Sequence, residues 1–556
     1  MDKRTILAII LSMIVILVWQ LMFAPERKEP PVVEEEARSV AKERRQDESA
    51  KEVTGYVEED EKELKVRDVV VDTTLYRAVF TTDGGSLKSW TLKDYKDSVE
   101  KVVLLRRTEV KPPQPVELVM VGESEDRPLE TEIGWNGSKE QEVVFDSDTY
   151  GLIVEGNREG SVVFIGRLKN GLEVVKRYRF YGDQYRVDLD LEIVNRGDEA
   201  VEPSVSLTWP GVVAQTGRYS FSGPSVLSGK SVARLKAKEI RKGRAFTEGI
   251  KWMAYEDNYF VSLIAPQGSG RPKVEVEQRE TSEKTTLGFN NRMTFQEGAV
   301  GPGGKQRFSV LLYMGPKLPE LLKNLDVEAE KAINFGKYLG SIEKVLLRIL
   351  AFTHRLTGNY GTDIIILSIL LKLIFLPLSR RSYKSMQEMQ KVQPEMKMLQ
   401  EKYKDDRQRL NQEMMALYKR RKINPVGGCL PMLVQFPFLI ALYKALPLFF
   451  NLRHAPFILW LRDLSSADSF FVDQLPLPFL GNTPVGPLPL LMGVSMVIQQ
   501  RMTPTMGDPR QAKMMMIMPI MFIFIFLSFP SGLVLYWFVQ NVLSIAEQYY
   551  TRRRGK

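Results

Sequence analysis

The sequence predicts a polytopic α-helical membrane protein with six transmembrane helices and one large all-β domain outside the membrane. Three observations lead to this fold class. Long apolar runs at the N-terminus and after about residue 340 flank a polar middle of roughly 250 residues. That middle alternates apolar and polar residues with a period of two, as strands do. Basic residues gather in alternate loops between the C-terminal runs, as expected for a multi-pass protein.

The first apolar run, Thr5–Ala24, is predicted to be a retained membrane anchor, which assigns residues 1–24 to it. A cleaved signal peptide is the alternative, but a run of about 20 residues is longer than the apolar part of a typical signal peptide. A lysine and an arginine precede the run and place the N-terminus in the cytoplasm. Residues 25–65 are dense in Glu, Lys, Arg and Pro, a composition that predicts a disordered tether.

Residues 66–316 are predicted to form one large β-sandwich. Asn170-Gly171 is a type I′ hairpin signal between the runs Val162–Leu168 and Leu172–Phe180. From Tyr185 to Ile193, apolar residues alternate strictly with polar ones, as in a half-buried strand. Large sandwiches often bind sugars or proteins, but no carboxylate pair or aromatic platform falls in one site here. We interpret the domain as a docking or chaperoning module.

Residues 317–358 are predicted to connect the sandwich to the membrane. Leu318–Phe335 is expected to form a helix that leaves the sandwich. Tyr338–Leu356 has apolar residues on one side and basic residues among them, which is typical of an amphipathic helix in the outer membrane–water interface.

Residues 359–550 are predicted to hold the other five spans, followed by a basic tail at 551–556 that places the C-terminus in the cytoplasm. The spans are Thr362–Leu378, Cys429–Phe450, Leu488–Met502, Met514–Phe529 and Leu533–Tyr549. The basic segment 382–422 is expected to form a cytoplasmic helical hairpin whose second helix Asp406 can cap. Methionines recur in it at near-helical spacing, namely Met386, Met389, Met396 and Met414. They are either ordinary hairpin packing or a soft surface that adapts to varied apolar segments.

One lysine, Lys372, lies within the apolar run Thr362–Leu378. It lies about 9 Å from the end of the span that Arg380 and Arg381 mark. A charge at such depth is unfavourable by roughly 2.5–3.5 kcal/mol on insertion scales. Either its long side chain snorkels to the headgroups, or it faces a water-filled recess inside a helix bundle.

Other polar side chains lie in the cytoplasmic halves of the spans, namely Ser368, Gln435, Gln499, Gln540 and Asn541. Snorkelling would account for the position of Lys372, but it would not account for these other polar residues. No acidic residue is expected deep enough to neutralise Lys372, because Glu547 lies close to the inner end of its span. A hydrophilic groove that opens to the cytoplasm and stops short of the outer face accounts for all these groups. Lys372 would attract a polar or acidic tail of a nascent chain into it.

Composition argues against several other function classes. With one cysteine, Cys429, and two histidines, the chain has no intrachain disulfide and no Cys/His cluster with metal-ligand spacing. Residues 301–305 (GPGGK) lack full phosphate-loop spacing, so we expect no ATP site, no enzyme site and no cofactor. We assign the net charge of +9 to contact with anionic lipid, and expect no sequence-specific binding of nucleic acid.

Several motifs in the membrane part are specific. They are residues 424–431 (NPVGGCLP) with Gln435 and Pro437, residues 529–537 (FPSGLVLYW), residues 358–361 (GNYG) and residues 460–464. Together they resemble the YidC/Oxa/Alb family of membrane-protein insertases over roughly residues 338–550. The anchor and large sandwich look like the Gram-negative bacterial form, whose periplasmic domain has a β-supersandwich fold.

The resemblance implies an insertase or chaperone of the bacterial inner membrane, with nascent membrane proteins, the ribosome and the Sec translocon as partners. Lys372 stands where the family has its groove cation, which is most often arginine. The charge is kept, but bidentate pairing with a carboxylate is lost. The resemblance also places Ser368, Leu439, Ile525, Tyr536 and Trp537 along the substrate path.

Two other functions stay open at this point. A solute or ion transporter is disfavoured because the spans hold no deep carboxylate for proton coupling and no evident inverted repeat. Solute flux without protein insertion in proteoliposomes would favour it. A periplasmic-sensing receptor should lose its function when residues 66–314 are deleted, whereas an insertase should keep most of its activity.

Overall fold

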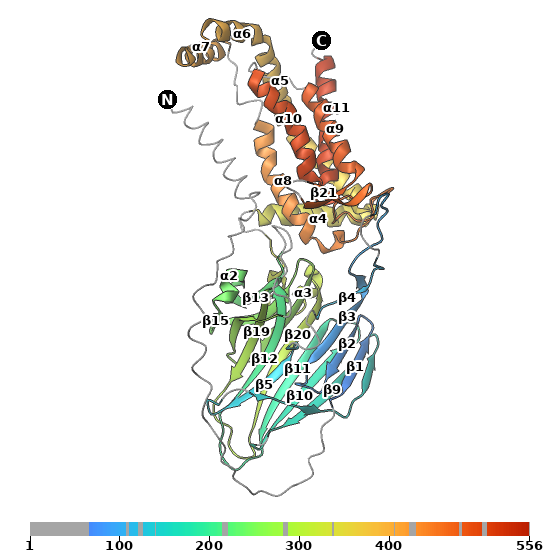
Figure 1. The fold of residues 1–556 in the computed structure, drawn as a ribbon, viewed down its shortest axis with the longest axis vertical. Coiled ribbons are helices and arrows are strands. Elements are labelled where there is room, and N and C mark those ends of the chain that lie inside the picture. Colours follow the sequence, from blue (N-terminus) through green and yellow to red (C-terminus); the bar gives the residue numbers. More distant parts are fainter. Residues whose placement is uncertain are drawn as a thin grey trace. The chain divides into compact units, whose positions relative to one another are not determined.

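The computed structural model describes residues 66–554, apart from short gaps. The gaps are 107–110, 120–125, 139–140, 169, 214–220, 269, 282–286, 336–338, 405, 422–429, 478–480 and 503–508. The predicted anchor (1–24), the tether (25–65), the motif residues 424–429 and the last two residues of the tail lie outside the described residues. Figure 1 shows most of the strands, in blue to yellow-green, gathered in one part, and the helices after residue 340, in yellow to red, gathered in another.

The β domain contains three sheets (Figure 1). The first has the order β4-β3-β2-β1-β8 and comprises β1 (Asp68–Thr73), β2 (Tyr76–Thr81), β3 (Leu87–Lys96), β4 (Pro115–Glu117) and β8 (Gly151–Val154). The second has the order β14-β13-β16-β17-β20-β11-β10-β9-β7. It comprises β7 (Phe145–Asp146), β9 (Glu159–Arg167), β10 (Leu172–Tyr181), β11 (Arg186–Asn195), β13 (Gly223–Ser228), β14 (Ser231–Arg234), β16 (Ile250–Glu256), β17 (Phe260–Gln267) and β20 (Lys305–Pro316). The third has the order β15-β18-β19-β12-β5-β6 and comprises β5 (Glu130–Trp135), β6 (Gln141–Glu142), β12 (Pro203–Val213), β15 (Arg244–Phe246), β18 (Lys273–Arg279) and β19 (Leu287–Gln296). A short helix, α2 (Ala237–Arg241), precedes β15.

The predicted hairpin and strand in this domain are confirmed. β9 and β10 pair antiparallel, and Gly171 in the turn has φ +81°, a value that favours glycine. On β11, the alternate residues from Val187 to Ile193 are fully buried. The buried residues of the sheets form one continuous apolar core, which includes the tryptophans Trp90, Trp209 and Trp252.

The predicted helix over Leu318–Phe335 is wrong. The chain instead forms two short pieces, α3 (Pro319–Lys323) and the 3₁₀ helix η1 (Ala329–Ala332), and Asp326 and Glu328 between them have positive φ. Leucines and alanines of both pieces pack into the core of the β domain. Tertiary burial therefore overrides the helix propensity of this segment.

Buried ion pairs and hydrogen bonds hold the segment that contains α3 and η1 against the β domain. Lys317 Nζ lies 2.5 Å from Glu256 Oε2, and Arg234 Nε lies 2.7 Å from Glu256 Oε1. Arg234 also donates to the carbonyls of Lys331 and Ala332 at 3.2 and 2.8 Å. Burial lowers the pKa of Lys317, and the Glu256 carboxylate opposes that shift. These ties hold α3 and η1 against the sheets.

The rest of the described chain is mainly helical. Its elements are α4 (Gly340–Thr357), α5 (Tyr360–Lys391), α6 (Gln393–Lys402), α7 (Arg407–Arg420), α8 (Leu430–Leu448), η3 (Phe450–Leu452), β21 (Val472–Leu477), β22 (Gly481–Val485), α9 (Pro487–Met502), α10 (Pro509–Phe526) and α11 (Ser531–Arg554). By length and composition alone, α5 is the one helix in the described part of the chain that is long and apolar enough to cross a membrane. Leu433–Leu448 and Ile517–Phe526 are shorter apolar stretches.

Each of the five predicted C-terminal spans lies on a helix, respectively α5, α8, α9, α10 and α11. α4 forms where the amphipathic helix was predicted and buries Leu346 and Leu350. α5 continues through Pro377 to Lys391, so the predicted span and the first arm of the hairpin are one helix.

The predicted hairpin segment is held by its own small apolar cluster. Met389, Val392, Met396 and Leu417 are buried there, and Met414 packs against them. Asp406 caps α7, because its side chain accepts from the Arg409 amide at 2.9 Å. Three of the four predicted methionines therefore contribute to packing within the hairpin, while Met386 is half-buried outside the cluster. Met398 and Met415 are exposed on the same helices.

The segment after α8 is anchored in the β domain. Phe450 belongs to the core of that domain, and its ring lies 5.2 Å from Tyr95 and 5.5 Å from Phe260, edge to face in both cases. Arg453 donates to the Lys96 carbonyl at 2.5 Å and lies over the Phe260 ring. Burial lowers the pKa of the Arg453 guanidinium. These contacts fix the first residues of the loop that leads from α8 to α9.

We expect Phe450→Ala to destabilise the protein by about 3–5 kcal/mol, because it leaves a cavity between buried rings. Thermal unfolding of the purified protein in detergent measures the loss. Phe352→Ala is the matched control, because Phe352 is exposed on α4. An unchanged midpoint for Phe450→Ala would show that this contact is dispensable.

Candidate functional site

The last helix, α11, connects the other helices of the bundle. Its side chains contact α5, α8, α9 and α10, and these contacts involve both polar and aromatic residues. Most of the residues predicted to form a groove either lie on α11 or contact it. We therefore treat the surroundings of α11 as the candidate site.

Three polar contacts join α11 to α5. Gln540 Nε2 donates to the Ser368 carbonyl at 2.8 Å, Lys372 Nζ donates to Ser544 Oγ at 2.8 Å, and Gln548 Nε2 donates to Tyr383 Oη at 3.1 Å. Gln540, Ser544 and Gln548 are four residues apart, so they share one face of the helix. Because the residue numbers rise together on the two helices, α5 and α11 run parallel.

Lys372 is paired with a carboxylate. Its Nζ lies 2.8 Å from Glu547 Oε2, and the two side chains are only 13% and 7% exposed. The next two residues on α5, Leu373 and Ile374, are 58% and 67% exposed. The lysine therefore points into the bundle, and the snorkelling interpretation is wrong.

The expectation that Glu547 lies too close to the inner end to neutralise Lys372 is also wrong. Lys372 is level with Ser544, and Glu547 lies three residues further, or about 4.5 Å along the helix axis. The four-carbon stem of a lysine covers that distance. Counting depth along each helix separately could not reveal this contact, because the contact depends on how the two helices pack.

α11 meets the remaining helices through other groups. Asn541 Nδ2 donates to Ser495 Oγ on α9 at 3.0 Å, and both residues are buried. Gln435 Nε2 on α8 lies 3.5 Å from Tyr536 Oη, the outer limit of a hydrogen bond. Trp537 stacks on Phe522 of α10 with centroids 6.0 Å apart.

The other predicted site residues differ in how far they are buried inside the protein. Ser368 is fully buried, and its hydroxyl donates to the Ile364 carbonyl at 2.7 Å. Leu439 and Ile525 pack partly buried against the helical core, and Gln499 is half-buried on α9. The predicted methionines form the separate hairpin cluster.

The start of α5 is set by local capping. Gly358 ends α4 with φ +64°, a conformation that favours glycine. The Asn359 side chain then accepts from the Thr362 amide at 3.1 Å. Asp363 is fully buried and accepts from the Thr357 hydroxyl at 2.7 Å. This corner fixes where Ser368 and Lys372 fall along α5.

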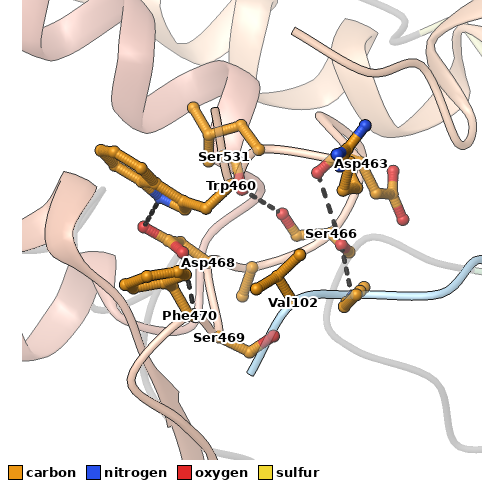
Figure 2. A pocket seen from close by; sticks show the side chains of 12 residues that line it. Val102, Trp460, Asp463, Ser466, Asp468, Ser469, Phe470 and Ser531 are labelled. Atoms are coloured by element: carbon orange, nitrogen blue, oxygen red, sulfur yellow. Dashed lines mark hydrogen bonds between the residues drawn. The ribbon is translucent and has the colours of Figure 1, made fainter. Parts of the chain in front are cut away.

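Polar residues in the loop between α8 and α9 fix the starts of α9 and α11 (Figure 2). The Asp468 carboxylate accepts from Trp460 Nε1 at 3.2 Å, from the Leu488 amide at 2.9 Å and from the Phe470 amide at 3.2 Å. A Cβ on Gly486 would clash with this carboxylate, so only glycine fits there. Figure 2 shows Trp460 and Phe470 on either side of Asp468.

The same loop holds the first residue of α11. The amide and the hydroxyl of Ser531 both donate to the Ser466 carbonyl at 2.7 Å. Lys101 of the β domain donates to Ser466 Oγ at 2.6 Å. Lys101, Ser466 and Ser531 line the small pocket drawn in Figure 2, and their hydrogen bonds position the start of α11.

Sequence reasoning missed three residues that matter here, namely Ser495, Ser544 and Asp468, and it considered Glu547 but rejected it as the partner of Lys372. The four-residue spacing from Gln540 to Ser544 and Gln548 is a signal that could have revealed the stripe facing α5. Asp468 carries no comparable signal, because its donors come from three separate places in the chain.

We expect Asp468→Ala to destabilise the helical part by about 1–3 kcal/mol for each buried donor it leaves unpaired. The loss of stability should appear as a lower midpoint of thermal unfolding in detergent. Gln474→Ala is the control, because that side chain is exposed in the same loop. Equal midpoints for the two variants would contradict the positioning role of Asp468.

Comparison with known proteins covers the whole chain. A family model described as "60Kd inner membrane protein" matches residues 352–556, and one described as "YidC periplasmic domain" matches residues 68–349. The chain is 38% identical to the membrane protein insertase YidC of Geotalea daltonii over 564 residues, which cover 100% of this chain and 99% of that protein. It is also 38% identical to the membrane protein insertase YidC of Geobacter sulfurreducens over 567 residues, which cover 100% and 98%.

A crystal structure of an active YidC insertase with its first transmembrane domain resolved is 19% identical and covers 87% of this chain and 92% of that chain. Its TM-score is 0.38, and the family of this chain is shown by the sequence matches. Those matches include both the β domain and the helical part. The chain belongs to the YidC family of membrane protein insertases, inner-membrane proteins that combine a periplasmic β domain with a membrane-helix region.

Proposed function

We propose that this protein moves nascent hydrophobic segments into the inner membrane through a hydrophilic groove that opens to the cytoplasm. Helices α5, α8, α9, α10 and α11 would border it. The observation that supports the groove is the concentration of polar groups around α11: Ser368, Lys372, Gln435, Ser495, Gln540, Asn541, Ser544 and Glu547. Such groups are unfavourable in lipid unless they are paired or hydrated.

The proposal includes a topology. Six helices cross the membrane, namely the anchor (1–24) and α5, α8, α9, α10 and α11, and both termini are cytoplasmic. The β domain then lies in the periplasm, with α4 in the outer interface. The 16 residues of α9 cover about 24 Å, less than a typical hydrocarbon core, so the bilayer would thin locally around it.

A substrate would use the two kinds of surface together. Its polar or acidic tail enters the groove and is attracted by Lys372, while its apolar part passes Leu439, Ile525 and Trp537 towards lipid. Local thinning lowers the remaining barrier, and no bond is made or broken. The same proposal makes the ribosome, the Sec translocon and anionic lipid partners of the chain, with the basic hairpin 382–422 facing the cytoplasm. Exposed Met398 and Met415 give that hairpin an adaptable apolar surface.

Site-specific photo-crosslinking to a ribosome-stalled nascent membrane protein tests the route. A photoreactive residue at Gln435, which is half-buried next to Tyr536, should form crosslinks to the polar tail. The control position is Ile374, which is 67% exposed on α5 and faces away from α11. Equal crosslinking at both positions would contradict a groove at this place.

Lys372→Ala should slow insertion of substrates with acidic external tails, because the attracting charge is gone. Lys372→Arg should be tolerated, because it keeps that charge. Complementation of a depletion strain, with insertion followed by protease protection, measures both variants. Equal activity of Lys372→Ala and wild type on acidic-tailed substrates would defeat the electrostatic part of the proposal.

A further inference from the structure

The Lys372–Glu547 pair puts a carboxylate of the protein itself at the cation that the proposed groove offers to acidic substrates. The two groups are 2.8 Å apart and largely shielded from solvent. An acidic segment that enters the groove therefore meets a neutral ion pair. Its attraction to that pair is weaker than its attraction to a lone ammonium would be, since the two charges largely cancel beyond the pair.

We propose that Glu547 is an internal counter-ion that occupies Lys372 until an acidic segment displaces it, and that it thereby sets how strongly this insertase selects acidic tails. This inference rests on the proposed groove. It assigns Glu547 a role in specificity, because the exchange of one carboxylate for another at Lys372 determines the preference. The substrate feature it discriminates is an aspartate or glutamate in the translocated tail.

Ser544 keeps its hydrogen bond to Lys372 while one carboxylate replaces the other. Its hydroxyl donates to the Gln540 carbonyl at 2.8 Å, so its oxygen lone pairs are free to accept from Lys372 Nζ at 2.8 Å. Serine therefore holds the ammonium in place whichever carboxylate is bound. Tyr383 and Gln548 join the same two helices further along, which keeps α5 and α11 together during the exchange.

The identity of the cation also favours exchange. An arginine offers a planar fork that can bind a carboxylate through two parallel bonds, whereas a lysine ammonium is a compact point charge. A monodentate contact to Glu547 is easier to replace than a bidentate one.

The experiment uses the full-length protein in proteoliposomes and two single-span substrates that differ only in having aspartates or asparagines in the external tail. Initial insertion rates are measured by protease protection, and the readout is the ratio of the aspartate rate to the asparagine rate. Glu547→Gln should raise this ratio roughly three- to tenfold over wild type. The control, Glu388→Gln, removes an exposed carboxylate paired with Lys391 on the hairpin and should leave the ratio unchanged.

Combined variants separate this inference from the proposed function. Lys372→Ala should lower the ratio, and Lys372→Ala with Glu547→Gln should also stay below wild type, because the attracting charge is still missing. If Lys372→Ala lowers the ratio but Glu547→Gln leaves it at the wild-type value, the counter-ion role is overturned and the groove cation stands. If Lys372→Ala leaves the ratio unchanged, the electrostatic capture fails and this inference falls with it.

A purely structural role for Glu547 is also detectable. In that case Glu547→Gln would slow both substrates equally and leave the ratio unchanged, which overturns the inference. If Glu547→Gln does not fold, Glu547→Asp is the second variant, because its shorter side chain holds Lys372 less closely and should be displaced more easily. That variant should raise the ratio above that of wild type, and an unchanged ratio overturns the inference.

Discussion

The helical part of this protein depends on one constraint: a polar side chain between apolar helices is stable only if it has a partner or water. α11 supplies those partners on several sides. Gln540 and Ser544 bond to α5, Asn541 bonds to Ser495 on α9, and Tyr536 is within reach of Gln435 on α8. The polar groups therefore specify how the helices are arranged, whereas apolar contacts alone would allow several arrangements.

The β domain and the loop between α8 and α9 are tied by both apolar and polar contacts. Phe450 contributes its ring to the β core, and Arg453 and Lys101 make hydrogen bonds across the same junction. The loop in turn holds the start of α11 through Ser466 and that of α9 through Asp468. A continuous set of contacts thus runs from the sheets to the helix that carries the candidate site.

In the proposed function, the charge state of the Lys372 site would bear directly on insertion. A lone cation would attract any acidic segment, and it would itself be unfavourable in the membrane. Pairing Lys372 with Glu547 reduces that penalty. In the proposed groove, the affinity for a substrate carboxylate would then depend on competition with Glu547, so the stability of the empty site and the capture of acidic tails would be linked.

The sequence alone determined the strands, the Asn170-Gly171 hairpin, the five C-terminal helices and the position of Lys372 in its apolar run. Each of these depends on residues that lie close together in the chain, so local periodicity reveals it. The prediction of one helix over Leu318–Phe335 was wrong, because packing on the β core overrides the helical preference of this segment. Only the tertiary structure decided the partner of Lys372, because Glu547 lies 175 residues further along the chain and the pairing requires α5 and α11 to run parallel and in register. Which polar groups meet is a property of helix packing, and no local pattern encodes it.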